Sequence, residues 1–335
     1  MAEIKAREKI EKIEQAIHNL ANHERKCCLC PRECEANRQQ GEEGFCESSS
    51  SASISHATLH FGEEPLLSGH YNYIKNSLKD PTPRHGSGTI FFTGCNLKCV
   101  FCQNFQLSWY KERNTVSSEK LAEKMLRLQE QGALNINLVS PSHMILPILK
   151  ALKIAYLKGL SLPLVYNSNA YEKAEVLRNL EGIVDIYLPD FKYFSSHASA
   201  KYSGASDYFQ YASQAIKEMY CQQPALVLNS KKVAQKGLII RHLVLPGQTS
   251  DSITLLEWIS RNLSLSVCLS IMSQYYPCFK APPEIQRSLT REEYVNVVSK
   301  AKELGFKNML IQPEPFARNE HLIPDFKIKD PFRWK

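Results

Sequence analysis

The spacing of hydrophobic and polar positions changes near residue 89 of this chain. Residues 3–22 carry an apolar side chain at every third or fourth position, flanked by Glu and Lys, which predicts an amphipathic helix. Residues 26–88 show no such period and hold cysteines, a serine-rich run and several turn-forming residues. We therefore expect this part of the chain to be irregular.

From residue 89 onward, short apolar runs alternate with amphipathic stretches of helical length. The predicted strands are residues 89–93, 134–139, 162–166, 183–188, 238–245, 266–272 and 308–311. The predicted helices are residues 117–131, 143–158, 172–180, 208–221, 252–262 and 291–304. Strands that alternate with helices in this way form βαβ units around a parallel sheet.

This alternation predicts an α/β fold, specifically a partial TIM-like (βα)6 barrel with an irregular, cysteine-containing N-terminal segment. We divide the chain into an N-terminal helix and cysteine-rich cap (1–84), the barrel (85–315) and a C-terminal tail (316–335). Barrels of this kind carry their chemistry at the carboxyl ends of the strands, so candidate site residues are sought there.

Composition narrows the class of protein. The chain has 335 residues, of which 43% are hydrophobic, enough to build a core. It contains no apolar run of about 18 residues, so we expect no membrane span. Its charged first residues lack the apolar stretch of a secretory signal, so we expect a cytoplasmic protein. The net charge of +7 comes from dispersed basic residues and does not favour nucleic-acid binding.

Eleven cysteines are many for a chain expected in a reducing compartment, where metal or cluster ligation is more common than disulfides. Cys95, Cys99 and Cys102 follow the first barrel strand with the spacing C-x3-C-x2-C. Three thiolates on one loop can hold three irons of a [4Fe–4S] cluster and leave the fourth open, whereas structural zinc needs four ligands. An open iron can chelate an amino and a carboxylate group, such as the methionine end of S-adenosylmethionine.

A second group, Cys27, Cys30, Cys34 and Cys46, supplies four ligands on a short irregular segment. The spacing suits structural zinc or an auxiliary cluster and does not separate the two, and free thiols are the alternative. Cys28 would be the spare cysteine.

Two further features are candidate chemistry. Four polar residues downstream of the cysteine-rich segment form either a satisfied structural network or a polar cluster at the barrel mouth; they are His56, His60, Glu63 and Glu64. Cys278 follows the sixth strand, and its thiol could donate a hydrogen atom as a catalytic residue, although a lone buried cysteine is usually inert.

The three-cysteine motif, with Phe101 before its third cysteine, resembles that of the radical S-adenosylmethionine superfamily. Cys102-Gln103-Asn104 is similar to the Cys-His-Asn of pyruvate formate-lyase activating enzymes. Together with residues 60–65 and 86–88, it resembles an uncharacterised branch of iron–sulfur proteins related to those enzymes, over almost the whole chain.

This resemblance implies reductive cleavage of S-adenosylmethionine at a [4Fe–4S] cluster to a 5′-deoxyadenosyl radical, which abstracts hydrogen from a substrate. The substrate would be a small molecule or a glycyl residue of a partner glycyl-radical enzyme, and the reductant a flavodoxin or ferredoxin. The enzyme would be an oxidoreductase or lyase like the pyruvate formate-lyase activating enzyme.

The resemblance also places cofactor contacts at the strand ends. Asn104 would bond the ribose. The superfamily's Gly-Gly-Glu, which takes the methionine ammonium, is replaced here by a sequence with Ser140 and Ser142, whose hydroxyls could bond the ammonium without a carboxylate. Asn167 and Asn169 would reach ribose hydroxyls, or instead bond their own backbone in a turn.

The later strands carry the remaining candidates. Asp190 and Lys192 resemble the activase Asp-x-Lys and would take the ammonium and the carboxylate, or form a simple ion pair. Arg241 could fork the carboxylate, or pair structurally inside the barrel. Met272 would flank the adenine, or be an ordinary core residue.

The replacement of Gly-Gly-Glu by Ser-Pro-Ser-His supports a second hypothesis, an iron–sulfur electron-transfer or sensing protein with a degenerate S-adenosylmethionine site.

Overall fold

A ten-stranded β-sheet runs through the computed structural model, which describes residues 2–69, 85–110, 114–312 and 322–332. Its strands are β1 (Ala52–His60), β2 (Ser87–Phe92), β3 (Thr115–Val116), β4 (Ile136–Val139), β5 (Leu164–Ser168), β6 (Ile186–Pro189), β7 (Val227–Leu228), β8 (Ala234–Leu243), β9 (Cys268–Met272) and β10 (Asn308–Ile311). They lie in the order β10-β9-β8-β6-β5-β4-β2-β1-β3, and β7 pairs with β8.

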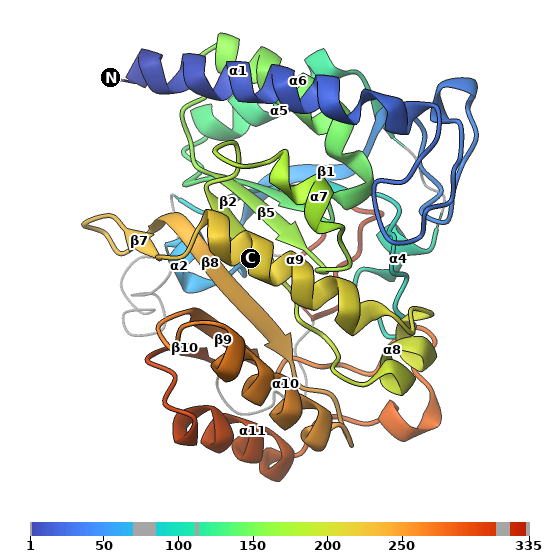
Figure 1. Ribbon diagram of the computed structural model, residues 1–335, viewed down its shortest axis with the longest axis vertical. Coiled ribbons are helices and arrows are strands. Elements are labelled where there is room, and N and C mark those ends of the chain that lie inside the picture. The colour runs from blue at the N-terminus through green and yellow to red at the C-terminus, as the bar shows by residue number, and fades with distance from the viewer. Residues whose placement is uncertain (1, 70–84, 111–113, 313–321, 333–335) are drawn as a thin grey trace.

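Helices lie before and between the strands, and the longer ones cover one face of the sheet (Figure 1). They are α1 (Ala2–Leu20), α2 (Pro65–Ser68), α4 (Phe105–Ser108), α5 (Ser118–Glu130), α6 (Ile145–Leu157), α7 (Ala174–Arg178), α8 (Ser196–Ser203), α9 (Tyr208–Gln222), α10 (Thr249–Asn262) and α11 (Arg291–Glu303). Every pairing from β2 through β10 along the main path is parallel. The predicted α/β fold with a parallel sheet is therefore confirmed, and the strand order leaves the barrel open, as a partial barrel requires.

The N-terminal segment contains a strand that the sequence did not predict. Residues 52–60 lie in the part expected to be irregular, yet they form β1, antiparallel to β2 from Ile54↔Phe92 to His60↔Ser87. The expectation of an irregular segment is wrong here. Ser and His residues lie on both faces of β1 and interrupt the apolar pattern by which a strand is recognised. Ala52 and Ile54 are nevertheless buried. The N-terminal helix α1 agrees with its prediction and packs against α6 (Figure 1).

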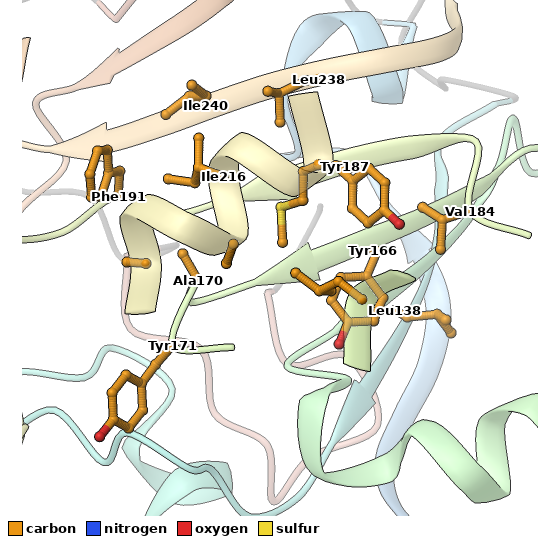
Figure 2. Packing of buried hydrophobic residues seen from close by; sticks show 14 of the residues in the cluster. Leu138, Tyr166, Ala170, Tyr171, Val184, Tyr187, Phe191, Ile216, Leu238 and Ile240 are labelled. Carbon is orange, nitrogen blue, oxygen red and sulfur yellow. The ribbon is translucent and has the colours of Figure 1, made fainter. Parts of the chain in front are cut away.

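The two faces of the barrel strands have different partners, because successive side chains of a strand point to opposite sides. Figure 2 shows Leu238 and Ile240 of β8, with Tyr187 of β6, beside Ile216 of α9. On the opposite face of the same strands a separate apolar cluster fills the interior. Its members are Leu66, Leu67, Val165, Ile186, Leu188, Ala234, Ile239 and Cys268. Short helix α2, from the N-terminal segment, is thus part of the barrel interior.

Two sequence predictions bear on the chain as a whole. No helix in the described ranges is long and apolar enough to cross a membrane. Residue 84 and residues 315 and 316, which mark the proposed domain boundaries, lie outside the described residues. The division into three parts therefore stays a prediction.

Candidate functional site

The three-cysteine loop begins where β2 ends. Gly94 has φ +83°, and a Cβ there would lie 2.4 Å from the carbonyl oxygen of Cys46, so this turn requires glycine. Lys98, in the middle of the loop, also has positive φ (52°). The Leu97 amide donates to Cys95 Sγ at 3.3 Å. The loop therefore folds back on its own first thiol.

The thiols of this loop interact with one another. Burial and then the thiol of Cys99 raise the pKa of Cys95. Burial, followed by Cys99, also raises the pKa of Cys102 to about 12. Neutral donors surround the group: Ser203 Oγ lies 3.0 Å from Cys99 Sγ, and Asn169 Nδ2 lies 3.6 Å from Cys95 Sγ. The structure thus gathers the three predicted ligands in one partly buried place.

A network of buried charges lies at the ends of β6 and β8. Arg241 Nε donates to Asp190 Oδ1 at 2.7 Å, its Nη1 to Glu63 Oε1 at 3.1 Å and its Nη2 to Asn167 Oδ1 at 2.7 Å. Glu63 Oε2 accepts in turn from Asn137 Nδ2 at 2.7 Å. All three guanidinium nitrogens therefore donate hydrogen bonds within the protein. This is the structural pairing that the sequence left as an alternative for Arg241.

Lys192 links this network to the cysteine loop. Its Nζ lies 2.8 Å from Asp190 Oδ2. Burial lowers the pKa of Lys192, but Asp190 and the Cys99 thiol outweigh burial and raise it overall. Burial likewise raises the pKa of Asp190, but the charges of Arg241 and Lys192 hold it below its usual range. Lys192 is thus a charged ammonium close to the thiols, available to an anion at this site.

The serines after β4 meet a carboxyl group that the sequence analysis did not single out. Ser142 Oγ donates to Glu172 Oε1, as does Ser168 Oγ at 2.6 Å, with Tyr166 OH at 3.3 Å. Burial raises the pKa of Glu172 to about 7, although the three hydroxyl donors each lower it. Ser140 has positive φ (56°) at the start of this turn. The hydroxyl of Ser142 is therefore already used by the protein.

The asparagines after β5 behave as turn residues at least in part. Asn169 Oδ1 accepts from the Tyr171 amide at 3.0 Å, the local bond expected of an Asx turn. Its Nδ2 donates to Asn96 Oδ1 at 2.8 Å as well as towards Cys95. Asn167 bonds Arg241. Both asparagine side chains therefore border the site, and hydrogen bonds to neighbouring residues fix their positions.

The remaining candidates lie around the cysteine loop. Asn104 is the N-cap residue of α4, two residues after Cys102. Met272 is buried and accepts from Gln274 Nε2 at 3.8 Å. Cys278 Sγ lies 3.5 Å from the carbonyl oxygen of Phe101, and burial raises its pKa to about 11. Cys278 is therefore beside the loop, and its role as a hydrogen-atom donor stays a prediction.

The four polar residues downstream of the cysteine-rich segment do not form one cluster. Glu63 joins the Arg241 network, and Glu64 accepts from Ser270 Oγ at 2.8 Å in the interior. His56 instead contacts the carbonyl oxygen of Ile328, and the His60 ring lies 4.3 Å from that of Phe332. Glu172 is the site residue that the sequence analysis missed. Glu63 was named there as a candidate, but its pairing with Arg241 was not predicted, because the two residues are distant in the chain.

The cysteine-rich segment lies against the three-cysteine loop. Glu47 pairs with Lys98 at 2.6 Å, and Arg32 Nε donates to the Asn96 carbonyl oxygen at 2.9 Å. Among the described residues, no three or more His, Cys, Asp or Glu side chains are arranged around a single metal ion. Cysteines of a cubane each bind a different iron, so they need not converge on one point.

The fold and site together define an open α/β barrel protein with a cysteine loop at the carboxyl end of its first parallel strand. The chain is 35% identical over 295 residues to the uncharacterized protein MJ0674 of Methanocaldococcus jannaschii, covering 84% of this chain and 75% of that protein. The chain therefore belongs to the same family as that protein. No family model matches the sequence.

Solved structures with a related arrangement are more distant. Streptococcus suis SuiB bound to S-adenosylmethionine has a TM-score of 0.43 and 14% identity, over 65% of this chain and 48% of SuiB. Native anSMEcpe with bound AdoMet has a TM-score of 0.44 and 14% identity, over 66% of this chain and 61% of that chain. The chain thus spans less than two thirds of either protein.

Proposed function

We propose that this protein is a radical S-adenosylmethionine enzyme, in which a [4Fe–4S] cluster supplies the electron that cleaves S-adenosylmethionine to a 5′-deoxyadenosyl radical. The observation that carries the proposal is the loop of Cys95, Cys99 and Cys102 at the carboxyl end of β2, where the Cys99 thiol raises the pKa of the other two and Lys192 carries a charge nearby. This is the end of a barrel where chemistry is expected.

The donor set fits such a cluster. Three soft thiols on one loop provide one ligand to each of three irons, and the neutral donors of Ser203 and Asn169 stabilise thiolates without competing for metal. Burial alone disfavours the thiolate form of these cysteines. Nearby hydrogen-bond donors and, for Cys95, the Lys192 ammonium offset part of that cost, and the pKa of Cys95 and of Cys102 is still raised.

The charged residues would orient the bound S-adenosylmethionine. Lys192 would hold its carboxylate and Asp190 its ammonium, while Arg241 keeps Asp190 ionised and in place. Asn167 accepts a hydrogen bond from Arg241, so its primary role here is to position that side chain. Further contacts to S-adenosylmethionine are proposed for Asn104, Ser140, Ser142, Asn169 and Met272. Cys278 would act as a hydrogen-atom donor.

For the substrate we propose a small molecule or a glycyl residue of a partner enzyme, as for the pyruvate formate-lyase activating enzymes that the sequence resembles. Flavodoxin or ferredoxin would be the reductant, in the cytoplasm. The motif resemblance around Cys102-Gln103-Asn104 supports this narrower assignment.

The test is anaerobic reconstitution with iron and sulfide, followed by dithionite and S-adenosylmethionine, with 5′-deoxyadenosine measured by mass spectrometry. We expect product from the wild-type chain and from Cys221→Ala, which changes an exposed cysteine, and none from Cys99→Ala. An intact cluster absorbance in Cys99→Ala would contradict the ligand assignment.

A second function is favoured by one observation: the hydroxyl of Ser142 and the guanidinium of Arg241 are already bonded within the protein. An iron–sulfur electron-transfer or sensing protein needs no cofactor contacts from them. A wild-type chain with a full, reducible cluster that yields no 5′-deoxyadenosine would establish this function in place of the first.

A further inference from the structure

The cysteine-rich segment has features that the proposed radical chemistry does not use. In residues 25–51 the described backbone forms only one short 3-10 helix, Arg38–Gln40, in place of longer helices or strands. Such a segment cannot bury enough apolar surface to order itself and is usually held by disulfides or metal. All of its cysteines are free thiols.

We propose that Cys27, Cys30, Cys34 and Cys46 bind a second metal centre through four thiolates, either a zinc ion or an iron–sulfur cluster. The fold of the segment brings the ligands near one another. Cys34 Sγ lies 3.9 Å from the carbonyl oxygen of Cys27, and it also lies against Gly44, two residues before Cys46. Among the described residues the thiols do not yet surround a single point, so their side chains would turn toward one another when metal binds.

The backbone around the first two cysteines forms two turns that present the thiols. The carbonyl oxygen of Cys27 accepts from the Glu35 amide at 3.0 Å, and that of Cys30 accepts from the Glu33 amide at 3.1 Å. The chain therefore turns back after each of these two cysteines.

These turns are strained. Glu33 and Glu35 have φ of 40° and 54°, the left-handed region that costs an ordinary residue on the order of 1–2 kcal/mol. Strain of this kind persists where surrounding structure fixes the conformation, and ligand sites are common cases. A bound metal would supply that constraint.

The surroundings of the other two cysteines fit the same centre. Arg38 is only 5% exposed, and its Nη2 donates to Cys46 Sγ at 3.3 Å, which places a positive charge beside the thiolates. A Cβ at Gly44 would lie 2.1 Å from Cys34 Sγ, so glycine leaves room for that thiol.

Cys28 differs from its neighbours and serves as a control. It is half-buried, whereas Cys27, Cys30 and Cys46 are buried. It is also the cysteine left over when the other four supply a complete set of ligands.

The proposed centre also has a structural consequence. Arg32 lies between two ligands and bonds the carbonyl oxygens of Asn96, Ser203 and Gly204, and Glu47 directly follows Cys46 and pairs with Lys98. Metal binding would fix both side chains on the three-cysteine loop.

The test uses the full chain with Cys95, Cys99 and Cys102 all changed to Ala, so that failure of the first cluster cannot affect the result. After anaerobic purification, zinc, iron and acid-labile sulfide are measured. We expect near-stoichiometric zinc, or iron with sulfide, and the two results identify the metal. Cys28→Ala should leave the content unchanged, whereas Cys30→Ala and Cys46→Ala should abolish it.

Two further measurements keep the test decisive where a variant fails to fold. Gly44→Ala keeps every thiol but displaces that of Cys34, and should lower metal content severalfold. In the unmodified chain, alkylation of the four cysteines should rise severalfold on adding a chelator, with Cys28 and Cys221 unchanged. A metal-free parent after incubation with zinc or with iron and sulfide, or chelator-independent alkylation, would overturn the proposal.

Discussion

Glu172 offers a quantitative test of the site, because its carboxyl is fully buried between the turns that follow β4 and β5. One oxygen accepts from the hydroxyls of Ser142, Ser168 and Tyr166. The other, Oε2, has no hydrogen-bond partner among the described residues. Burial, partly offset by the hydroxyl donors, raises the pKa of Glu172 to about 7.

The sign of the effect follows from which state keeps the proton. An unfolded chain releases this proton near pH 4.5, whereas the folded chain holds it up to about pH 7. The contribution to stability is therefore fully present below pH 4.5 and is lost as pH rises to 7. At 1.36 kcal/mol for each unit of pKa, the folded state loses about 3 kcal/mol over this window, and roughly 2–3 kcal/mol of it between pH 5 and pH 8.

The perturbation is Glu172→Gln, which keeps the size of the side chain and cannot ionise. Urea unfolding of anaerobic protein, followed by circular dichroism at pH 5 and pH 8, gives the free energy of unfolding of each variant. We expect the variant to be less stable at pH 5, because its buried amide lacks an acceptor, at a cost of roughly 1–3 kcal/mol. Between pH 5 and pH 8 the wild type should lose about 2–3 kcal/mol more than the variant.

Glu130→Gln, at an exposed position of α5, is the matched control and should follow the wild-type pH dependence. Parallel pH profiles for the wild type and Glu172→Gln would refute the argument that this carboxyl is neutral when folded. They would also place an ionised carboxylate beside Ser142, where the sequence lacks the superfamily's acid.

Two other substitutions test the remaining parts of the site. Arg241→Met leaves Asp190 and Glu63 buried without their common partner, and should lower the free energy of unfolding by about 3–5 kcal/mol; a loss below about 1 kcal/mol in urea unfolding would show that water replaces the guanidinium. Gly94→Ala forces a Cβ against the Cys46 carbonyl at positive φ, so we expect a severalfold loss of bound iron after reconstitution, and unchanged iron content would contradict the close approach.

The barrel was predictable because its strands are buried on both faces. β5, for example, is buried at every position, and its first three residues, Leu164 to Tyr166, form an apolar run in the sequence beside a helical pattern. β1 was not predictable in this way. Its outer half is only partly buried, and its register with β2 shifts between Ile54 and His56, so the alternation that identifies a strand is broken.

The cysteine loop was predictable from local spacing alone, because its three ligands lie within eight consecutive residues. Glu63 and Glu172 were not, since a buried acid has no local signature. Glu63 lies 178 positions from Arg241 in the chain, and only the fold brings the two side chains together. The sequence therefore assigned Arg241 to a cofactor carboxylate from its position in the motif, because the sequence does not show the residues that Arg241 binds inside the protein.

These internal partners bear on how S-adenosylmethionine would be held. Arg241 is bonded on three nitrogens and Ser142 on its hydroxyl, so recruiting either would break an existing buried interaction. Lys192 differs, because its ammonium makes one hydrogen bond among the described residues, to Asp190 Oδ2 at 2.8 Å, and keeps further N–H donors for a carboxylate. The pair of Lys192 and Asp190 is thus the part of the network that can meet an amino acid's carboxylate and ammonium at least cost. Arg241 and Glu63 then form the rigid support that keeps this pair charged and aimed at the loop.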